Sequence, residues 1–248
     1  MYFRLMEKIF LRSSVLLTSV SKPLSDYYYQ KYGREVHYVP NGVDIESQCN
    51  YEAADELLDR FGIKGEYLFF AARRIIPTKG CHTFLEALRL SNYQGQVVIA
   101  GEDVHGSTYM DEIREASQGL AVKFIGFVRD KPTLMALISR AKFFIFPSEI
   151  EGLSIMLLEV ASIGTTPMIC SDIPENKQVF DDSQVLFFGN RDTGDLARKL
   201  DWACENEESM ATRAIAAKKQ VVSDFSTKRV ALRYDELYRQ LLSQTNIQ

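Results

Sequence analysis

The chain has 248 residues, of which 46% are hydrophobic and 25% are charged, and its net charge at neutral pH is −4. Such a chain can bury one large or two modest hydrophobic cores, and it lacks the basic face that general nucleic-acid binding needs. No segment reaches the roughly 18 uncharged apolar residues of a membrane span. Charges also interrupt the apolar start of the chain, where a signal peptide would need an unbroken run. We therefore expect a cytoplasmic protein, with at most peripheral contact with the inner face of a membrane.

The four cysteines are far apart in the sequence, and none belongs to a CxxC pair or to a cluster with zinc spacing. Cys81 stands next to His82, but no further metal ligand lies nearby in the sequence. This pattern predicts reduced thiols and no bound metal.

The first residues predict an amphipathic helix. Arg4, Lys8 and Arg12 recur every four residues and therefore share one helical face. The opposite face carries three apolar side chains, Phe3, Met6 and Phe10. Because the basic run is short, a helix packed on protein is favoured over one that lies on a membrane surface.

Short apolar, β-branched or aromatic runs alternate with helix-like stretches along the chain. They predict strands at 14–20, 36–40, 67–72, 96–101, 122–127, 142–147, 166–170 and 185–188. Helices are predicted at 22–32, 52–61, 81–91, 108–118, 130–140, 153–163, 192–205, 207–223 and 227–243. Strands that are apolar on both faces indicate a parallel sheet covered on both sides. The expected fold class is α/β, a doubly wound, Rossmann-like parallel sheet, with ligands at the carboxyl ends of its strands.

The segment VPNGVD, residues 39–44, interrupts this alternation. Asn-Gly favours a tight turn, and a polar stretch follows it. An ordinary hairpin turn and a linker between two domains both fit the segment.

Three cations, Arg73, Arg74 and Lys79, follow the strand predicted at 67–72. Cationic groups at the end of a buried strand can neutralise a diphosphate, Arg through its bidentate fork and Lys as a point charge. Solvated surface charges would explain the same residues, and the loop taken alone favours that interpretation.

The segment EGLSIMLLEVASIG, residues 151–164, predicts a helix that begins near Leu153 and is apolar almost throughout. Its free N–H groups and positive dipole end suit a phosphate, and Gly152 lets a ligand approach the backbone closely. Glu159 in the middle of this helix needs a partner, because an unpaired buried charge is costly. That partner can be the hydroxyls of a ligand or a cation on a neighbouring helix.

These motifs, in this order, resemble the C-terminal half of glycosyltransferase family 4 (group 1), nucleotide-sugar-dependent enzymes of the GT-B fold. The similar segments are VPNGVD at 39–44, RIIPTKG at 74–80, VKFIGFV at 122–128 and EGLSIMLLE at 151–159. The last continues as VASIGTTPMICSDIPE, which is similar to a small-residue run of the family. The chain departs from the pattern at Arg73, where glycine is usual, and at Ser154, where a second glycine is common.

The resemblance implies roles for individual residues. The implied catalytic set is one carboxylate and two cations, Glu151, Arg74 and Lys79. The implied donor-binding set is Arg74, Lys79, Phe127, Val128, Gly152, Leu153, Ser154 and Glu159. In this arrangement the cations hold the diphosphate, Glu159 accepts from the ribose hydroxyls, and Glu151 lies by the donor sugar. The loop at 127–128 borders the base, and the backbone at 152–154 meets the sugar and phosphate.

The function implied by the resemblance is transfer of a sugar, with retention of its anomeric configuration, from a nucleotide sugar to an acceptor. The expected donor is a UDP-, GDP- or ADP-sugar, and the expected acceptor is a glycan or a lipid-linked glycan. Such a hexosyltransferase would serve surface polysaccharide or glycolipid synthesis and would need no metal or other cofactor. The alternative is a non-catalytic nucleotide-sugar-binding or scaffold module.

The resemblance also implies the domain organisation. Residues 1–43 correspond to a remnant of the N-terminal acceptor domain and a linker, 44–225 to the nucleotide-sugar-binding domain, and 226–248 to a C-terminal crossover helix. Without the rest of the acceptor domain, that helix should expose an apolar patch, formed by Val230, Tyr234, Leu237, Tyr238 and Leu241. Such a patch favours self-association or binding of a separate N-terminal half.

Overall fold

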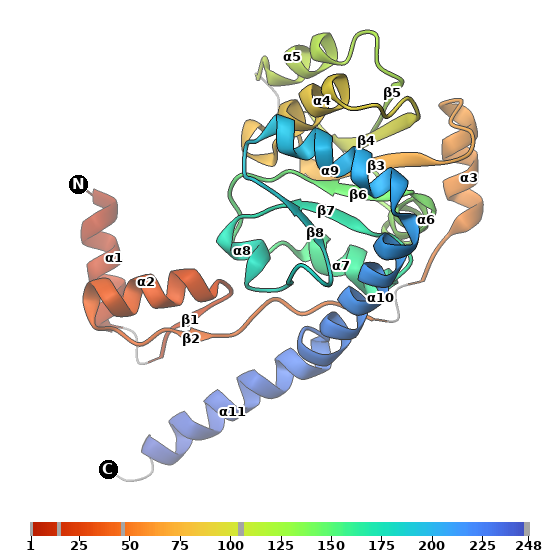
Figure 1. Ribbon diagram of the computed structural model, residues 1–248. Helices are drawn as coiled ribbons and strands as arrows, with labels where there is room; N and C mark the ends of the chain where they lie inside the picture. The colour runs from red at the N-terminus through yellow and green to blue at the C-terminus, as the bar shows by residue number, and fades with distance from the viewer. Residues whose placement is uncertain (1, 14–15, 46–47, 104–106, 246–248) are drawn as a thin grey trace.

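A computed structural model of the chain describes residues 2–13, 16–45, 48–103 and 107–245. At its centre is a six-stranded sheet in the order β5-β4-β3-β6-β7-β8, in which all neighbours are parallel (Figure 1). The strands are β3 Tyr67–Arg74, β4 Gln96–Glu102, β5 Val122–Gly126, β6 Phe143–Phe146, β7 Met168–Ser171 and β8 Leu186–Phe188. All six lie where the sequence pattern predicts them.

Helices cover both faces of this sheet, with one buried core on each side. One face carries α4 Cys81–Leu90, α5 Tyr109–Ala116 and α9 Thr193–Glu205. The other carries α3 Tyr51–Arg60, α6 Lys131–Arg140, α7 Ile155–Ile163 and α10 Glu207–Asp224. The predicted doubly wound α/β fold is confirmed. Two short helices were not predicted, η1 Pro77–Lys79 and α8 Pro174–Lys177.

The chain changes direction across the sheet between β3 and β6. From β3 it proceeds outwards through β4 to β5, then returns to β6 beside β3 and proceeds outwards through β7 to β8. Connections diverge on the two sides of such a switch point, so the carboxyl ends of the two central strands border a crevice that suits a ligand.

The N-terminal segment forms a small substructure beside the main sheet (Figure 1). It consists of α1 Tyr2–Ser13, β1 Thr18–Ser19, α2 Lys22–Tyr32 and β2 His37–Tyr38, and its two strands pair in parallel. Both strands are shorter than predicted, and residues 14–15 lie outside the described ranges. The backbone N–H of Lys22 donates to Gln178 Oε1 at 2.7 Å, which joins this substructure to the segment after α8.

Among the described side chains of α1, one is buried and one takes part in a hydrogen bond with α2. Leu11 is buried, and Glu7 accepts a hydrogen bond from the Tyr32 hydroxyl at 2.9 Å. Met6 and Phe10, on the face predicted to be packed, are exposed. The predicted burial is therefore wrong for Met6 and Phe10, whereas the side chain of Phe3 lies outside those that the structure describes. No helix within the described ranges is long and apolar enough to span a membrane.

The segment 39–44 forms neither a hairpin nor a tight turn. It leaves β2 and runs beside the start of α11 Thr227–Thr245, where Val43 forms a parallel bridge with Ser226. Gly42 does not have a positive φ, but a Cβ on it would stand 3.0 Å from Thr227 Cα. The glycine is therefore needed for the close approach of two chain segments rather than for a turn.

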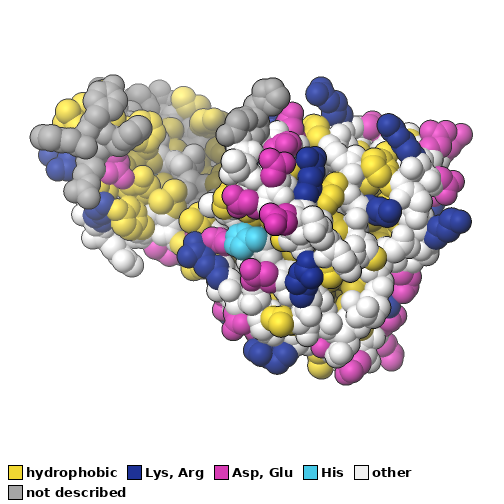
Figure 2. All heavy atoms as spheres, turned by 90° about the horizontal axis from the view of Figure 1, so that it is seen from above, with side chains coloured by type: hydrophobic (Ala, Val, Ile, Leu, Met, Phe, Trp, Pro, Cys, Tyr) yellow, Lys and Arg dark blue, Asp and Glu magenta, His cyan; other side chains and the backbone are white. Residues whose placement is uncertain are grey.

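Exposed apolar side chains gather on the N-terminal substructure. Seven of them belong to α1 and α2: Leu5, Met6, Ile9, Phe10, Leu24, Tyr27 and Tyr29. Figure 2 shows hydrophobic side chains on the smaller lobe at the left, where Figure 1 places these helices. We call these seven residues the N-terminal apolar face.

The patch predicted on α11 is only partly present. Val230 is 7% exposed because it packs beside Gly42, which corrects its predicted exposure. Tyr234, Leu237 and Leu241 are half-buried, whereas Tyr238 is 60% exposed. Within the described ranges, three large apolar side chains of α11 are exposed, Leu232, Tyr238 and Leu242, against seven in the N-terminal apolar face.

All four cysteines are free thiols. Cys81 is buried, and burial raises the pKa of its thiol to about 12, so it stays protonated and unreactive at neutral pH. Within the described ranges, no three His, Cys, Asp or Glu side chains come together in a way that could hold a metal ion.

Gly80 joins the loop after β3 to the loop after β6. It ends η1 with a φ of 68°, and a Cβ on it would overlap the backbone carbonyl of Pro147. Close by, the N–H of Glu149 donates to the Thr78 carbonyl at 2.9 Å. Only glycine permits both this φ and this contact, so packing at the switch point explains the Lys-Gly pair of the motif.

We predict that Gly80→Ala lowers the free energy of unfolding by about 3 kcal/mol, because left-handed strain and a backbone clash act together. Gly62→Ala is the matched control, since Gly62 has a φ of 66° but no atom within 4 Å of a Cβ. That control should lose only about 1 kcal/mol, the strain alone. Urea unfolding of both variants measures the difference, and equal losses would contradict the packing role of Gly80.

Candidate functional site

A cavity of about 460 Å³ opens at the switch point of the sheet. It lies between the loop after β3, the loop after β6 and the first turn of α7. Its wall contains Asn41, Phe70, Ala71, Ala72, Arg73, Arg74, Ile76, Lys79, Phe146, Ser148, Glu151, Leu153, Ser154, Ile155, Met156 and Glu159. The cavity therefore brings together the cations of one loop and both carboxylates of the segment 151–159.

The two cations predicted to bind a diphosphate differ in their surroundings. Arg74 is exposed and, within the described ranges, forms no ion pair or hydrogen bond through its side chain. Lys79 Nζ lies 2.6 Å from Glu151 Oε1, and these side chains are 28% and 10% exposed. The resemblance implied separate roles for Lys79 and Glu151, whereas in the structure their side chains form an ion pair. The pair holds Lys79 beside the cavity and neutralises a largely buried carboxylate.

The first turn of α7 begins at Ile155, two residues later than predicted. The reason is Ser154, whose backbone is extended and whose Oγ accepts from the Leu157 N–H at 3.4 Å, so that it acts as the N-cap. The N–H groups of Ile155 and Met156 then lack partners within the helix. These two residues line the cavity, so the positive end of the helix dipole borders it.

Gly152 lies just outside the cavity wall. Its carbonyl accepts from Gln178 Nε2 at 3.4 Å, and a Cβ on it would meet only Val20 Cγ2, at 3.8 Å. Packing therefore does not require glycine here, and its role in ligand approach stays a prediction. Leu153 and Ser154, in contrast, belong to the wall.

Of the two kinds of partner expected for Glu159, a ligand hydroxyl or a cation, the structure shows a cation. Glu159 Oε1 lies 2.7 Å from Lys131 Nζ on α6, and the Glu159 side chain is 12% exposed. Glu159 also lines the cavity, so the ion pair does not remove it from the site.

A second, smaller cavity of about 90 Å³ adjoins the first. Phe127 and Val128 line it, together with Ala100, Gly101 and Leu134. It shares four residues with the larger cavity: Ala71, Ala72, Arg73 and Met156. Its lining is mostly apolar, which suits a flat ring, and Arg73 contributes a cation where the family pattern has glycine.

Sequence reasoning missed a network around Glu149, whose side chain is only 9% exposed. Its carboxylate lies 3.4 Å from His82 Nε2 and 2.6 Å from Arg191 Nη2. His82 Nδ1 in turn lies 2.8 Å from the Tyr109 hydroxyl. The first turns of α4 and α5, the loop after β6 and the loop before α9 thus meet beside Lys79 and Glu151. No signal in the sequence could have joined them, because neither spacing nor motif relates these residues.

Asn41 is a second residue that the sequence interpretation missed. Its Nδ2 donates to the Leu153 carbonyl at 2.9 Å, and it lines the cavity. Asn41 therefore holds the chain immediately before α7. The motif VPNGVD was the available signal, but it indicated a turn or linker and gave no role to the asparagine.

Residues 54–220 match the family model for glycosyl transferases group 1. The chain belongs to this family. The glycogen synthase of Mycobacterium tuberculosis (strain H37Rv) is 27% identical to this group 1 chain over 238 residues, which cover 83% of the chain and 57% of the relative. The O-antigen biosynthesis glycosyltransferase WclY of Escherichia coli is 22% identical over 231 residues, with coverages of 91% and 61%. The chain thus spans about three fifths of the length of these relatives.

Solved structures of glycosyltransferases share the fold of this group 1 chain. HepE of Anabaena, in complex with UDP and glucose, superposes with a TM-score of 0.85 at 19% identity, covering 96% of this chain and 66% of HepE. The sucrose-phosphate synthase of Thermosynechococcus elongatus gives 0.82 at 21% identity, with coverages of 98% and 63%. These similarities confirm the GT-B type of fold that the sequence resemblance implied.

We predict that Asn41→Ala lowers the free energy of unfolding by about 1 kcal/mol, the usual contribution of one hydrogen bond. It should also speed amide hydrogen exchange in residues 150–156, because the loop before α7 loses its tie. Asn206→Ala is the matched control, since Asn206 Nδ2 donates to the Trp202 carbonyl at 2.8 Å, away from the cavity. Unchanged exchange at 150–156 in Asn41→Ala would contradict this role.

Proposed function

We propose that this chain is the donor-binding half of a retaining glycosyltransferase that transfers a hexose from a nucleotide sugar to a glycan or lipid-linked acceptor. The observation that carries the proposal is a single cavity bordered by Arg74, Lys79 and the first turn of α7. Two cations and a helix N-terminus together suit a diphosphate. The carboxylates in the same wall suit sugar hydroxyls.

The chemistry asked of these groups is stabilisation of a leaving nucleoside diphosphate. Breakage of the bond between sugar and diphosphate leaves negative charge on the departing oxygen. Arg74 and Lys79 stabilise that charge from positions that are set before the reaction, which lowers the free-energy barrier to breaking the bond. Glu151 keeps Lys79 beside the cavity and lies by the donor sugar. The main chain at Gly152, Leu153 and Ser154 leads into the turn that receives the phosphate. No metal or other cofactor is needed for this role.

The nucleoside part of the donor is proposed to occupy both cavities. The base enters the small apolar cavity at Phe127 and Val128, and Glu159 accepts hydrogen bonds from the ribose hydroxyls. A UDP-sugar is the first choice, because HepE, similar in fold, is described in complexes with UDP and with UDP-glucose. GDP- and ADP-sugars are the other donors to test.

The biological setting is proposed to be the synthesis of a surface polysaccharide or glycolipid in the cytoplasm or at the inner face of its membrane. Similarity to an O-antigen biosynthesis glycosyltransferase supports this setting. A non-catalytic nucleotide-sugar-binding module is the second candidate, because binding of a donor in this cavity does not by itself require transfer of the sugar.

The N-terminal apolar face is proposed to bind the remaining, acceptor-side half of such an enzyme. Its seven exposed apolar side chains lie within residues 1–43, the segment that the sequence resemblance assigns to the acceptor domain. Adding a separate N-terminal half of a relative and measuring sugar transfer separates the two candidates. Transfer only with both halves supports the enzyme, and binding of donor without transfer supports the module.

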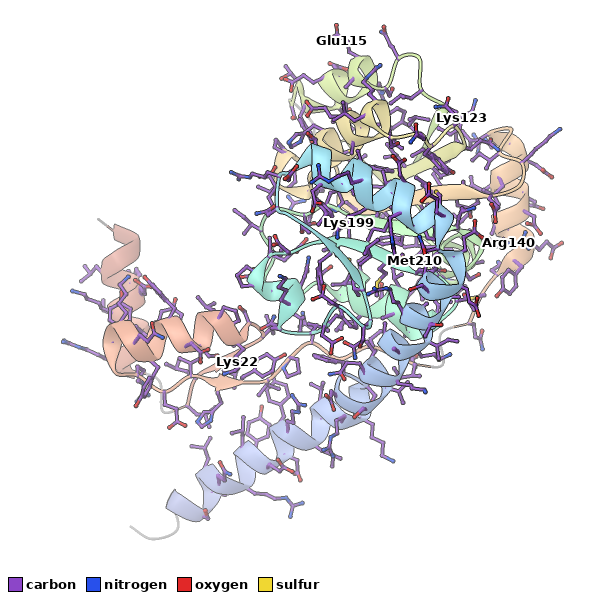
Figure 3. The ribbon with its side chains drawn as sticks, in the orientation of Figure 1. Lys22, Glu115, Lys123, Arg140, Lys199 and Met210 are labelled. Carbon is purple, nitrogen blue, oxygen red and sulfur yellow. The ribbon has the colours of Figure 1, made fainter. Side chains whose placement is uncertain are left out.

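We predict that UDP binds to the chain and that Arg74→Ala and Lys79→Ala each weaken it about tenfold to hundredfold, the range of one charge-assisted hydrogen bond. Isothermal titration calorimetry measures these affinities. Lys123→Ala is the control, because Lys123 is an exposed lysine on β5 that lines neither cavity (Figure 3). It should bind UDP as the unaltered chain does.

Two results would contradict the proposal. One is the absence of binding by UDP, GDP and ADP alike. The other is equal loss of affinity in Lys123→Ala and Lys79→Ala, which would indicate general electrostatic attraction rather than a diphosphate site.

A further inference from the structure

Glu159 has one carboxylate oxygen engaged and one available. Its side chain is 12% exposed, and its neighbours Leu158 and Val160 on α7 are buried. Oε1 pairs with Lys131 Nζ at 2.7 Å, whereas Oε2 has no hydrogen bond or ion pair within the described part of the chain. Because the residue lines the large cavity, Oε2 is the acceptor that a ligand can use.

The position of Lys131 is not explained by the stability of its own helix. Lys131 is the first residue of α6, where a cation opposes the positive end of the helix dipole. Asp130 Oδ2 caps the helix by accepting from the Thr133 N–H at 3.0 Å, and Pro132 fixes the following φ. The backbone at Lys131 is thus set from both sides. Within the described ranges, the only ion pair of Lys131 is the one with Glu159.

The Lys131–Glu159 pair also links the two cavities. Lys131 follows the loop whose Phe127 and Val128 line the small cavity, and Glu159 lines the large one. This ion pair fixes the distance between the proposed base subsite in the small cavity and the Glu159 carboxylate that is proposed to accept from the ribose. Groups held in place before binding lose less entropy when the ligand arrives.

We propose that Lys131 is a positioning residue for nucleotide recognition: it holds the Glu159 carboxylate so that Oε2 accepts a ribose hydroxyl. This inference rests on the proposed function and adds to it the source of a preference for ribonucleotides. Lys131 does not touch the nucleotide. Without it, the Glu159 carboxylate turns freely and the distinction between a ribose and a sugar lacking both hydroxyls is lost.

The test compares UDP with 2′,3′-dideoxy-UDP by isothermal titration calorimetry. The unaltered chain should prefer UDP about tenfold or more, the value of a hydrogen bond to a charged group. In Lys131→Met the affinity for UDP should fall close to that for 2′,3′-dideoxy-UDP. The affinity for 2′,3′-dideoxy-UDP itself should be nearly unchanged. Glu159→Gln should also reduce the preference, and the double variant should match Glu159→Gln, because the two residues act as a unit. Lys131→Arg should restore the preference.

Lys142→Met is the matched control. Lys142 Nζ pairs with Glu66 Oε2 at 3.0 Å and Glu207 Oε1 at 2.5 Å, at the amino end of β6, so its loss should lower stability without changing the preference. Lys131→Gln replaces Lys131→Met should the latter fail to fold. A full preference for UDP in either Lys131 variant overturns the inference while the proposed function stands. Absence of UDP binding by the unaltered chain overturns the proposed function first.

Discussion

The contact between Gly80 and the backbone of Pro147 is the constraint on which the site depends. It brings the loop after β3 against the loop after β6, at the point where the chain reverses its progress across the sheet. Lys79 stands immediately before this contact, and Glu151 four residues after it. A side chain at position 80 would separate the two loops and widen the cavity between them.

Electrostatic pairing then sets the character of this cavity. Two carboxylates that are largely out of water, Glu151 and Glu159, each have a lysine within 2.7 Å, on different elements. Taking a carboxylate out of water is costly, and the paired lysine offsets part of that cost. The wall therefore contains polar groups that are already oriented, beside an arginine that is free of ion pairs within the described ranges.

The sheet could be predicted because its strands are short, apolar on both faces and separated by helices, a pattern that depends only on local sequence. The gathering of Arg74, Lys79 and the start of α7 followed from the same pattern, since parallel strands place their following loops at one edge. A cation on a neighbouring helix was one of the two partners expected for Glu159, but that this cation is Lys131 could not be predicted. The network around Glu149 could not be predicted either, because it joins side chains from elements with no fixed spacing. The exposed strip of α1 was also missed, because periodicity identifies an apolar face but not what covers it.

The parallel bridge between Val43 and Ser226 holds the segment after β2 against the start of α11. Asn41 lies two residues before Val43 and donates a hydrogen bond to the carbonyl of Leu153. A displacement of the N-terminal substructure about this bridge would strain the hydrogen bond of Asn41 and shift the chain that leads into α7. The start of α7 therefore takes its position from two amide side chains, Asn41 at Leu153 and Gln178 at Gly152, both of which connect it to the N-terminal substructure.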